Sequence, residues 1–170
     1  MQSRIGVYAG SFDPITKGHL ALISVGSSLF DELIVLVANN PKKKYLFSTT
    51  QRLLLVKDAI KEIQEHILTN VRVELMEVGS TARHAKALGA NFLLRGMRNG
   101  KDFEEEREID FINRKLNPDL QTIYLFTSKD LGEISSSSVK ALMSISARDV
   151  VEEMVTRNVY RALLGEFECQ

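Results

Sequence analysis

The stretch RIGVYAGSFDPITKGH, residues 4–19, decides the fold of this chain. Its first part, Arg4–Ala9, is short and apolar, which is typical of a β-strand. Gly10 ends that strand, the pair Asp13-Pro14 predicts a turn, and a helix is predicted to begin near Thr16. The stretch therefore predicts one strand joined to one helix through a tight turn, the unit from which α/β folds are built.

Gly18 and His19 fall in the first turn of this predicted helix. Free N–H groups and the positive end of the helix dipole favour a phosphate there, and His19 would donate a hydrogen bond to it. A lone histidine in this place would more often cap a tight strand-to-helix turn. The whole run GSFDPxTxGH is far more specific, and it favours a phosphate-binding function.

The alternation of strand and helix continues along the chain. Further strands are predicted at Glu32–Ala38, Val71–Glu77, Asn91–Leu94 and Gln121–Phe126. Helices are predicted from near Ser48, where Ser48 and Gln51 have capping-box spacing, over Thr81–Leu88 before Gly89, over Asp102–Leu116, from Ser135, and over Asp149–Leu164. This order predicts a parallel sheet covered on both faces, with a ligand at the carboxyl ends of its strands. With no repeat and no linker, residues 1–170 are expected to form a single domain.

The composition of the chain gives no support for several classes of partner. Lys plus Arg and Asp plus Glu both number 22, so a net charge of zero gives no support for a nucleic-acid partner. The lone cysteine, Cys169, has no second thiol for a disulfide or metal site. The N-terminus lacks a signal-peptide pattern and no apolar run is long enough to cross a bilayer, so we expect a cytoplasmic protein without a membrane partner.

Positive charge follows two of the predicted strands. The loop after Glu32–Ala38 carries Lys42–Lys44, which would usually be solvated, although one of them could reach a phosphate at this edge. Arg95 and Arg98 flank a glycine directly after Asn91–Leu94, so both guanidinium groups are expected at the ligand edge, where arginine binds phosphate bidentately. The alternative is that each arginine pairs with the acidic helix that follows it.

Serines open the segment after the fifth predicted strand. Ser135–Ser138 would supply hydroxyls and free N–H groups at the start of a helix, a cradle for a second phosphate-bearing group. Serine-rich helix starts are common, so this signal gains weight only because it converges with the others.

These segments, in this order, closely resemble the phosphopantetheine adenylyltransferases, bacterial enzymes of the penultimate step of coenzyme A synthesis. The resemblance rests on GSFDPITKGH, the lysine loop, RGMRNGKDFEEE, NRKLNP and ISSSSVK. The first and last runs are shared by a wider nucleotidyltransferase superfamily, whereas RGMR with DFEEE and NRKLNP is narrower. The resemblance implies a Rossmann-like doubly wound sheet of five parallel strands in the order 3-2-1-4-5.

The resemblance also implies the reaction, in which ATP and 4′-phosphopantetheine give dephospho-coenzyme A and pyrophosphate. The acceptor already carries an anionic phosphate, so such an enzyme needs alignment and charge compensation rather than a base. Magnesium is expected to accompany the ATP phosphates, with no metal site built from the protein's own acids. A homohexamer is implied by the family alone.

Carried over residue by residue, the resemblance predicts three catalytic groups: His19 stabilises the transition state, Lys43 contacts the acceptor phosphate and reacting centre, and Arg98 binds the ATP phosphates. Acceptor contacts are predicted at Ser11, Lys43, Thr81 and Arg95. ATP contacts are predicted at Ser11, Phe12, His19, Gly96, Met97, Arg98, Glu106, Leu131, Gly132, Glu133, Ile134, Ser135, Ser136 and Ser137.

The chain departs from the family pattern in three places. Gly79–His84 replaces a usually apolar stretch, Glu105 replaces a common aromatic residue, and Glu133 stands where Phe is usual. Acceptor affinity and feedback by coenzyme A are left open by these departures. Two rival functions also remain: another adenylyl- or cytidylyltransferase of the superfamily, such as one acting on nicotinamide mononucleotide, and a non-catalytic nucleotide-binding regulator.

Overall fold

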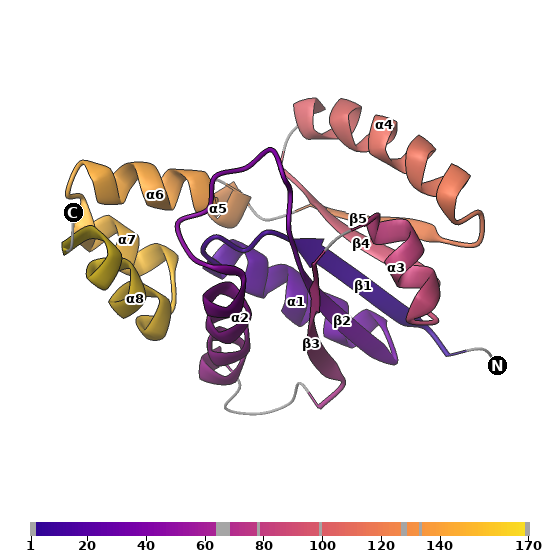
Figure 1. Cartoon of the computed structure of the whole chain (residues 1–170), viewed down its shortest axis with the longest axis horizontal. Helices are drawn as coiled ribbons and strands as arrows, with labels where there is room; N and C mark the ends of the chain where they lie inside the picture. The colour runs from indigo at the N-terminus through magenta and orange to yellow at the C-terminus, as the bar shows by residue number, and fades with distance from the viewer. Residues whose placement is uncertain are drawn as a thin grey trace.

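The protein is built around one parallel sheet, seen in a computed structural model that describes residues 3–63, 69–77, 79–98, 100–126, 129–132 and 134–168 (Figure 1). Its strands lie in the order β3-β2-β1-β4-β5, and all four pairings are parallel. The strands are β1 (Ile5–Gly10), β2 (Glu32–Ala38), β3 (Val71–Met76), β4 (Phe92–Met97) and β5 (Gln121–Phe126). The predicted α/β class and strand order are confirmed.

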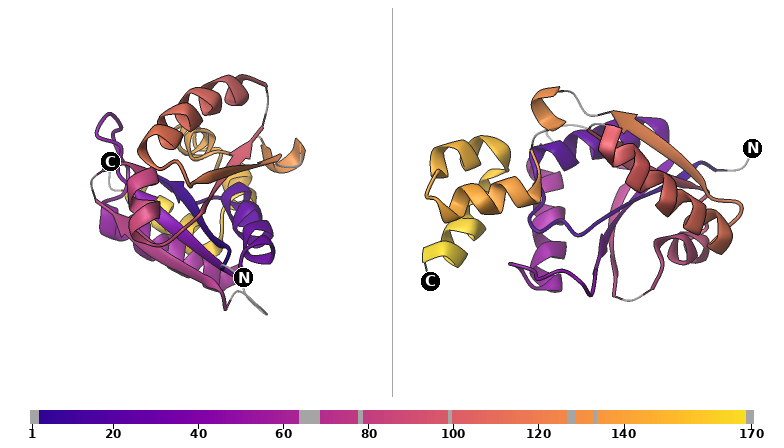
Figure 2. Two further views of the ribbon diagram at one scale, coloured as in Figure 1. Left: turned by 90° about the vertical axis from the view of Figure 1, so that its right-hand side faces the viewer. Right: turned by 90° about the horizontal axis from the view of Figure 1, so that it is seen from above.

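Helices connect the strands and cover both faces of the sheet. They are α1 (Lys17–Leu29), α2 (Thr49–Ile63), α3 (Thr81–Ala87), α4 (Gly100–Leu116), α5 (Lys129–Gly132), α6 (Ser136–Ser144), α7 (Arg148–Met154) and α8 (Arg157–Glu168). Figure 2 shows α6–α8 gathered at one end of the molecule, away from the N-terminus. No helix within the described part of the chain is long and apolar enough to cross a membrane.

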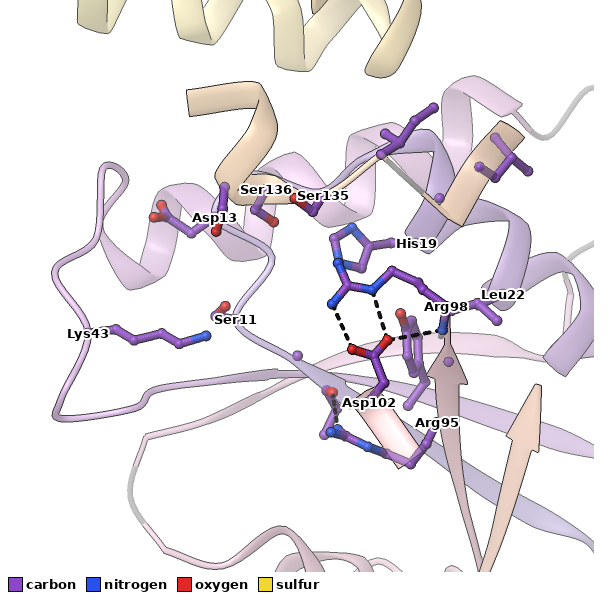
Figure 3. Close-up of a pocket in the computed structure, with 18 of the residues that line it drawn as sticks. Ser11, Asp13, His19, Leu22, Lys43, Arg95, Arg98, Asp102, Ser135 and Ser136 are labelled. Carbon is purple, nitrogen blue, oxygen red and sulfur yellow. Dashed lines mark hydrogen bonds and ion pairs between the residues drawn. The ribbon is translucent and has the colours of Figure 1, made fainter. Parts of the chain in front are cut away.

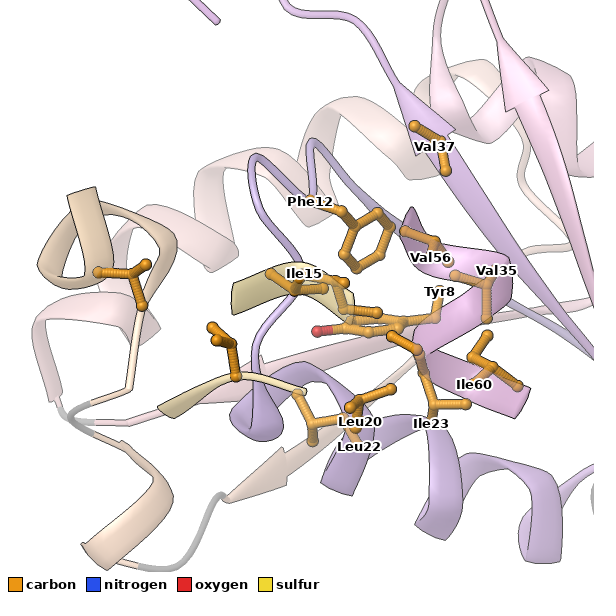
Figure 4. Close-up of a cluster of buried hydrophobic side chains, with 14 of the residues drawn as sticks. Tyr8, Phe12, Ile15, Leu20, Leu22, Ile23, Val35, Val37, Val56 and Ile60 are labelled. Atoms are coloured by element: carbon orange, nitrogen blue, oxygen red, sulfur yellow. The ribbon is translucent and has the colours of Figure 1, made fainter. Parts of the chain in front are cut away.

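The two faces of the sheet carry separate cores, because successive side chains of a strand point to opposite faces. Tyr8 and Val35 belong to the larger core, which α1, α2 and the C-terminal helices complete (Figure 4). Val7 and Ile34, their neighbours along the strands, belong to the smaller core, to which α3 contributes Ala82 and Ala85. β1 and β2 are therefore buried on both sides, as continuous runs of Val, Ile and Leu require.

The predicted start of α2 is confirmed by its hydrogen bonds. The backbone N–H of Ser48 donates to the Gln51 side chain at 2.8 Å, and the N–H of Gln51 donates to the Ser48 hydroxyl at 3.3 Å. This reciprocal capping box satisfies two donors that a helix start otherwise leaves open.

Two predicted elements differ from the structure by more than one or two residues at an end. β4 continues to Met97, three residues past the predicted end at Leu94, because Arg95, Gly96 and Met97 pair in register with β5. The predicted helix over Asp149–Leu164 is two helices, α7 and α8. The start of α8 is capped from another element, since the Glu62 carboxylate of α2 accepts the N–H groups of Arg157 and Asn158 at 2.7 and 3.2 Å.

Candidate active site

A cavity of about 680 Å³ opens at the carboxyl ends of β1 and β4, where the strand order reverses (Figure 3). It collects residues from β1, the lysine loop, β4, α4 and the serine segment. Among the residues predicted from the sequence, its walls contain Ser11, His19, Lys43, Arg95, Gly96, Arg98, Glu106, Leu131, Ile134, Ser135, Ser136 and Ser137.

A second cavity of about 360 Å³ adjoins the first on the side of β2 and β3. All four residues predicted to contact the acceptor line it: Ser11, Lys43, Thr81 and Arg95. Ser11, Lys43 and Arg95 also line the larger cavity, so these three residues stand where the two spaces meet. The arrangement can hold two ligands side by side, with positive charge at their junction.

His19 is held as a neutral hydrogen-bond donor. Its Nδ1 accepts the backbone N–H of Thr16, the N-cap of α1, at 3.1 Å, so the proton of the neutral ring is on Nε2. Burial, with a smaller contribution from the positive charge of Arg98, lowers the pKa of His19 to about 4. The ring is uncharged near neutral pH and offers one N–H from the wall of the larger cavity.

The first turn of α1 packs directly against Leu131, Ile134 and Ser136, which lie in and around the serine segment that leads into α6. A Cβ atom at Gly18 would come within 2.9 Å of the Ile134 carbonyl oxygen and 3.0 Å of that of Leu131, so only glycine fits this contact. The Ser136 hydroxyl donates to the Pro14 carbonyl at 2.8 Å, which joins the two segments a second time. The start of α6, where the Ser135 side chain accepts the N–H of Ser138 at 3.0 Å, is thereby placed beside His19.

Each pocket arginine is held by a carboxylate of α4. Arg95 donates from Nε to Glu106 at 2.8 Å and from Nη2 to the second oxygen of the same carboxylate. Burial lowers the pKa of Arg95, but the hydrogen bond and the charge of Glu106 outweigh it, so the pKa is raised. Arg98 donates from Nε and Nη2 to Asp102 at 3.0 and 3.2 Å, as Figure 3 shows beside His19. Asp102 and Glu106 are four residues apart and so lie on one face of α4.

Asp13 ties the turn after β1 to two other segments. Its buried carboxylate accepts the backbone N–H groups of Leu46 and Phe47 at about 3 Å and the Lys140 ammonium at 2.8 Å. Lys43 lies in the lysine loop, just before Leu46. Figure 3 shows its side chain extending toward Ser11. The predicted turn at Asp13-Pro14 thus also anchors the lysine loop and α6.

Some of the predicted site residues do not present their side chains to the cavities. The side chain of Phe12, a predicted ATP contact, is 1% exposed and packs edge-on against Tyr8 and His19, so its ring belongs to the core. Met97 is 4% exposed and Gly132 is buried, and neither lines either of the two cavities described above. Arg95 lies within β4 rather than after it, and reaches the cavity because its strand ends at the pocket. Glu133 lies outside the described residues.

Other lining residues were missed by the sequence analysis. Asp102 lies four residues after Arg98, a spacing typical of helical ion pairs and the signal that could have found it. Lys140 stands in the run ISSSSVK, but its partner Asp13 is 127 residues away. Tyr8 and Tyr45 also line the larger cavity, and no local pattern distinguishes them from core residues.

Comparison with known proteins identifies the family of the chain. Residues 7–142 match the cytidylyltransferase-like family. The chain is 39% identical over 165 residues to the phosphopantetheine adenylyltransferase of Caldanaerobacter subterraneus, covering 97% of this chain and 98% of that one. The enzyme of the same name from Thermosynechococcus vestitus is 41% identical over 159 residues, covering 94% and 90%.

Among solved structures, Plasmodium falciparum nicotinic acid mononucleotide adenylyltransferase complexed with NaAD superposes with a TM-score of 0.69 at 18% identity. The match covers 98% of this chain and 96% of that one, and at this identity it supports the fold alone. The sequence matches carry the finer assignment, because they extend over nearly the whole of both chains. The chain belongs to the phosphopantetheine adenylyltransferase family of cytidylyltransferase-like nucleotidyltransferases.

Proposed function

We propose that this protein transfers the adenylyl group of ATP to 4′-phosphopantetheine, forming dephospho-coenzyme A and pyrophosphate. The observation that carries the proposal is the junction of the two cavities, where Ser11, Lys43 and Arg95 line both spaces. ATP occupies the larger cavity, between His19, Arg98 and the serine segment. The acceptor occupies the smaller one, with its phosphate at the junction.

The reaction is a single displacement at the α-phosphorus of ATP. An oxygen of the acceptor phosphate forms the new P–O bond, and the bond from the α-phosphorus to the bridging oxygen of pyrophosphate breaks. The attacking oxygen is already anionic, so no residue has to remove a proton from it. The protein's contribution is to hold two mutually repelling anions in line.

Charge compensation is divided among the pocket residues. Nε2–H of His19 donates to the oxygens of the α-phosphoryl group, where negative charge is concentrated in the transition state. Lys43 and Arg95 bind the acceptor phosphate, and Arg98 binds the departing pyrophosphate. Because Asp102 and Glu106 hold the two guanidinium groups in place, little side-chain ordering is needed when the substrates bind.

Magnesium is proposed as the counter-ion of ATP rather than as a resident ion. Within the described part of the chain no group of three His, Cys, Asp or Glu side chains could hold a metal. Four carboxylates line the larger cavity: Asp13, Asp102 and Glu106 are each paired with a cation, which leaves Glu105 as a single candidate ligand. These carboxylates do not make a site for a divalent cation, so no residue is assigned to it.

A homohexamer is proposed from the family resemblance, with support from the surface of α4. Phe103, Ile109, Phe111 and Ile112 of this helix are 42–63% exposed, more apolar surface than one helix usually presents to water. A cytoplasmic location is proposed because the reaction consumes ATP.

The test is to incubate the protein with ATP, Mg²⁺ and one acceptor at a time, and to follow pyrophosphate release. We expect release with 4′-phosphopantetheine and formation of dephospho-coenzyme A. Release with nicotinamide mononucleotide but not with phosphopantetheine would overturn the choice of acceptor. ATP binding without turnover of either acceptor would instead support a regulatory role.

A further inference from the structure

Arg52 is a buried cation next to the candidate active site to which the proposed reaction gives no role. It lies on α2, its side chain is 0% exposed, and it lines neither cavity. Its Nη1 donates to the carbonyl oxygens of Ser11 at 2.6 Å and Ala38 at 3.2 Å. Its Nη2 donates to the Asn39 side chain and, at 3.2 Å, to the Thr49 hydroxyl.

Stability alone does not explain an arginine in this place. The charge of Asp13 acts on Arg52, but that carboxylate pairs with Lys140 instead, and the Nε of Arg52 has no hydrogen-bond partner among the described residues. Burial lowers the pKa of Arg52 in spite of the charge of Asp13, so the site disfavours the charged form of a side chain whose direct hydrogen-bond partners are all neutral. Its acceptors are carbonyl, amide and hydroxyl oxygens that a shorter or apolar side chain could not gather.

The groups that Arg52 holds belong to the segments that form the junction of the two cavities. Ser11 itself lines both spaces. Asn39 opens the lysine loop, and the guanidinium group lies 4.1 Å from the centre of the Tyr45 ring near the end of that loop. Tyr45 closes the loop, because its hydroxyl accepts the backbone N–H of Asn40.

The backbone of Lys43 is held within this loop, because its N–H donates to the Asn40 carbonyl at 2.9 Å. Arg52 therefore joins the turn after β1 to both ends of the lysine loop. Its contacts set the separation between Ser11 and Lys43, on either side of the junction.

We infer that Arg52 is a positioning residue for the acceptor side of the reaction, holding Ser11 and the lysine loop at the spacing that the acceptor phosphate requires. It touches no substrate and acts through the groups it binds. This inference rests on the proposed function for the identity of the acceptor.

The test compares Arg52→Lys with two other variants of α2. Lysine keeps the charge but cannot reach four acceptors or stack flat on Tyr45. Thr49→Val removes one partner of Nη2 with little change of volume, and still tests the inference if Arg52→Lys fails to fold. Val56→Ala leaves a cavity in the core one turn along the same helix and serves as the control for lost stability.

We expect Arg52→Lys to raise the KM for 4′-phosphopantetheine by about tenfold or more, because small misplacements of binding groups have effects of this size. Thr49→Val should shift it in the same direction by a smaller factor. The KM for ATP should rise by a smaller factor than the KM for the acceptor, because among the described residues Ser11 is the one predicted ATP contact that Arg52 binds directly. Val56→Ala should leave both KM values unchanged. An unchanged acceptor KM in Arg52→Lys and Thr49→Val would refute the inference.

Amide hydrogen exchange gives a readout that does not depend on the acceptor. Residues 39–47 should exchange faster in Arg52→Lys than in the wild type and Val56→Ala, because the loop loses its attachment to α2. A wild-type protein that releases no pyrophosphate would refute the proposed function, while exchange would still test the positioning. Equal exchange of residues 39–47 in all three proteins would refute the positioning even if the enzyme is active.

Discussion

At the scale of the residue, one backbone hydrogen bond to His19 determines which of its ring nitrogens can donate to a substrate. The N–H of Thr16 occupies Nδ1 and leaves the only proton of the neutral ring on Nε2, at the wall of the cavity. We expect His19→Ala to lower kcat by about a hundredfold, the usual loss for one donor to a transition-state oxyanion. His19→Gln, which retains an N–H donor, should lose less. A near-normal kcat in His19→Ala would remove His19 from the mechanism.

The lowered pKa of His19 has a consequence for pH. With a folded-state pKa of about 4 against an ordinary value of 6.5, the ring stays neutral in the folded protein while it protonates in the unfolded chain. Its contribution to stability is therefore complete above pH 6.5 and is lost as the pH falls toward 4.

We expect NMR signals of the His19 ring, assigned with His19→Gln, not to titrate between about pH 8 and pH 5.5. Over the acidic part of that range, denaturant unfolding should show wild-type stability falling relative to His19→Gln. A ring that titrates near 6.5 would contradict the burial of His19.

Glu106 and Asp102 each hold an arginine that we assign to a different substrate. Glu106 was predicted to contact ATP, yet both of its oxygens accept from Arg95, which lines both cavities. We expect Glu106→Gln to raise the KM for the acceptor by about tenfold, because a neutral amide holds Arg95 more weakly. Asp102→Asn should instead raise the KM for ATP through Arg98. Steady-state kinetics with each substrate varied in turn would distinguish the two effects, and a higher KM for ATP alone in Glu106→Gln would favour the predicted contact of Glu106 with ATP.

At the scale of the element, the contact between α1 and the serine segment depends on the absence of one side chain. Gly18→Ala would place a Cβ against two backbone carbonyl oxygens, which cannot move as a flexible side chain can. We expect a loss of about 1–3 kcal/mol in the free energy of unfolding and a higher KM for ATP, as the two segments separate.

Gly165→Ala on α8 is the matched control, because nothing lies within 4 Å of its Cβ position. Alanine in a helix is better than glycine by about 0.5–1 kcal/mol, so this variant should be neutral or slightly more stable. Denaturant unfolding and kinetics on both variants make the comparison. Equal stability of Gly18→Ala and the wild type would contradict the close approach.

At the scale of the whole molecule, the exposed apolar face of α4 predicts assembly. We expect light scattering to give a mass that is a multiple of the 19.1 kDa protomer. Phe111→Lys with Ile112→Lys, at side chains 63% and 55% exposed, should shift the protein toward the protomer mass without unfolding it. Leu54→Lys, on α2 and 53% exposed, is the control and should not. A wild-type protein at the protomer mass would rule out the proposed hexamer.

The signals that were readable in the amino-acid order act over a few residues. The capping box at Ser48, the turn at Asp13-Pro14 and the apolar runs of β1 and β2 each depend on near neighbours, so they predicted the elements and the edge of the sheet where the pocket lies. The end of β4 was misplaced for the opposite reason. Arg95 and Gly96 look like a loop until the pairing with β5 is known.

The sequence by itself thus determined the α/β class and the order of the elements. It also determined that cationic and serine-rich segments lie near one pocket. Folding in three dimensions decided which side chains face that pocket and what holds them. The side chain of Phe12 is buried in the core, and α4 carries the carboxylates that bind two arginines. Arg52 donates to the carbonyl of Ser11, 41 residues away in the sequence. Hydrogen bonds and ion pairs between distant segments leave no periodic trace in the chain, because their partners come together only when the sheet and its helices have packed.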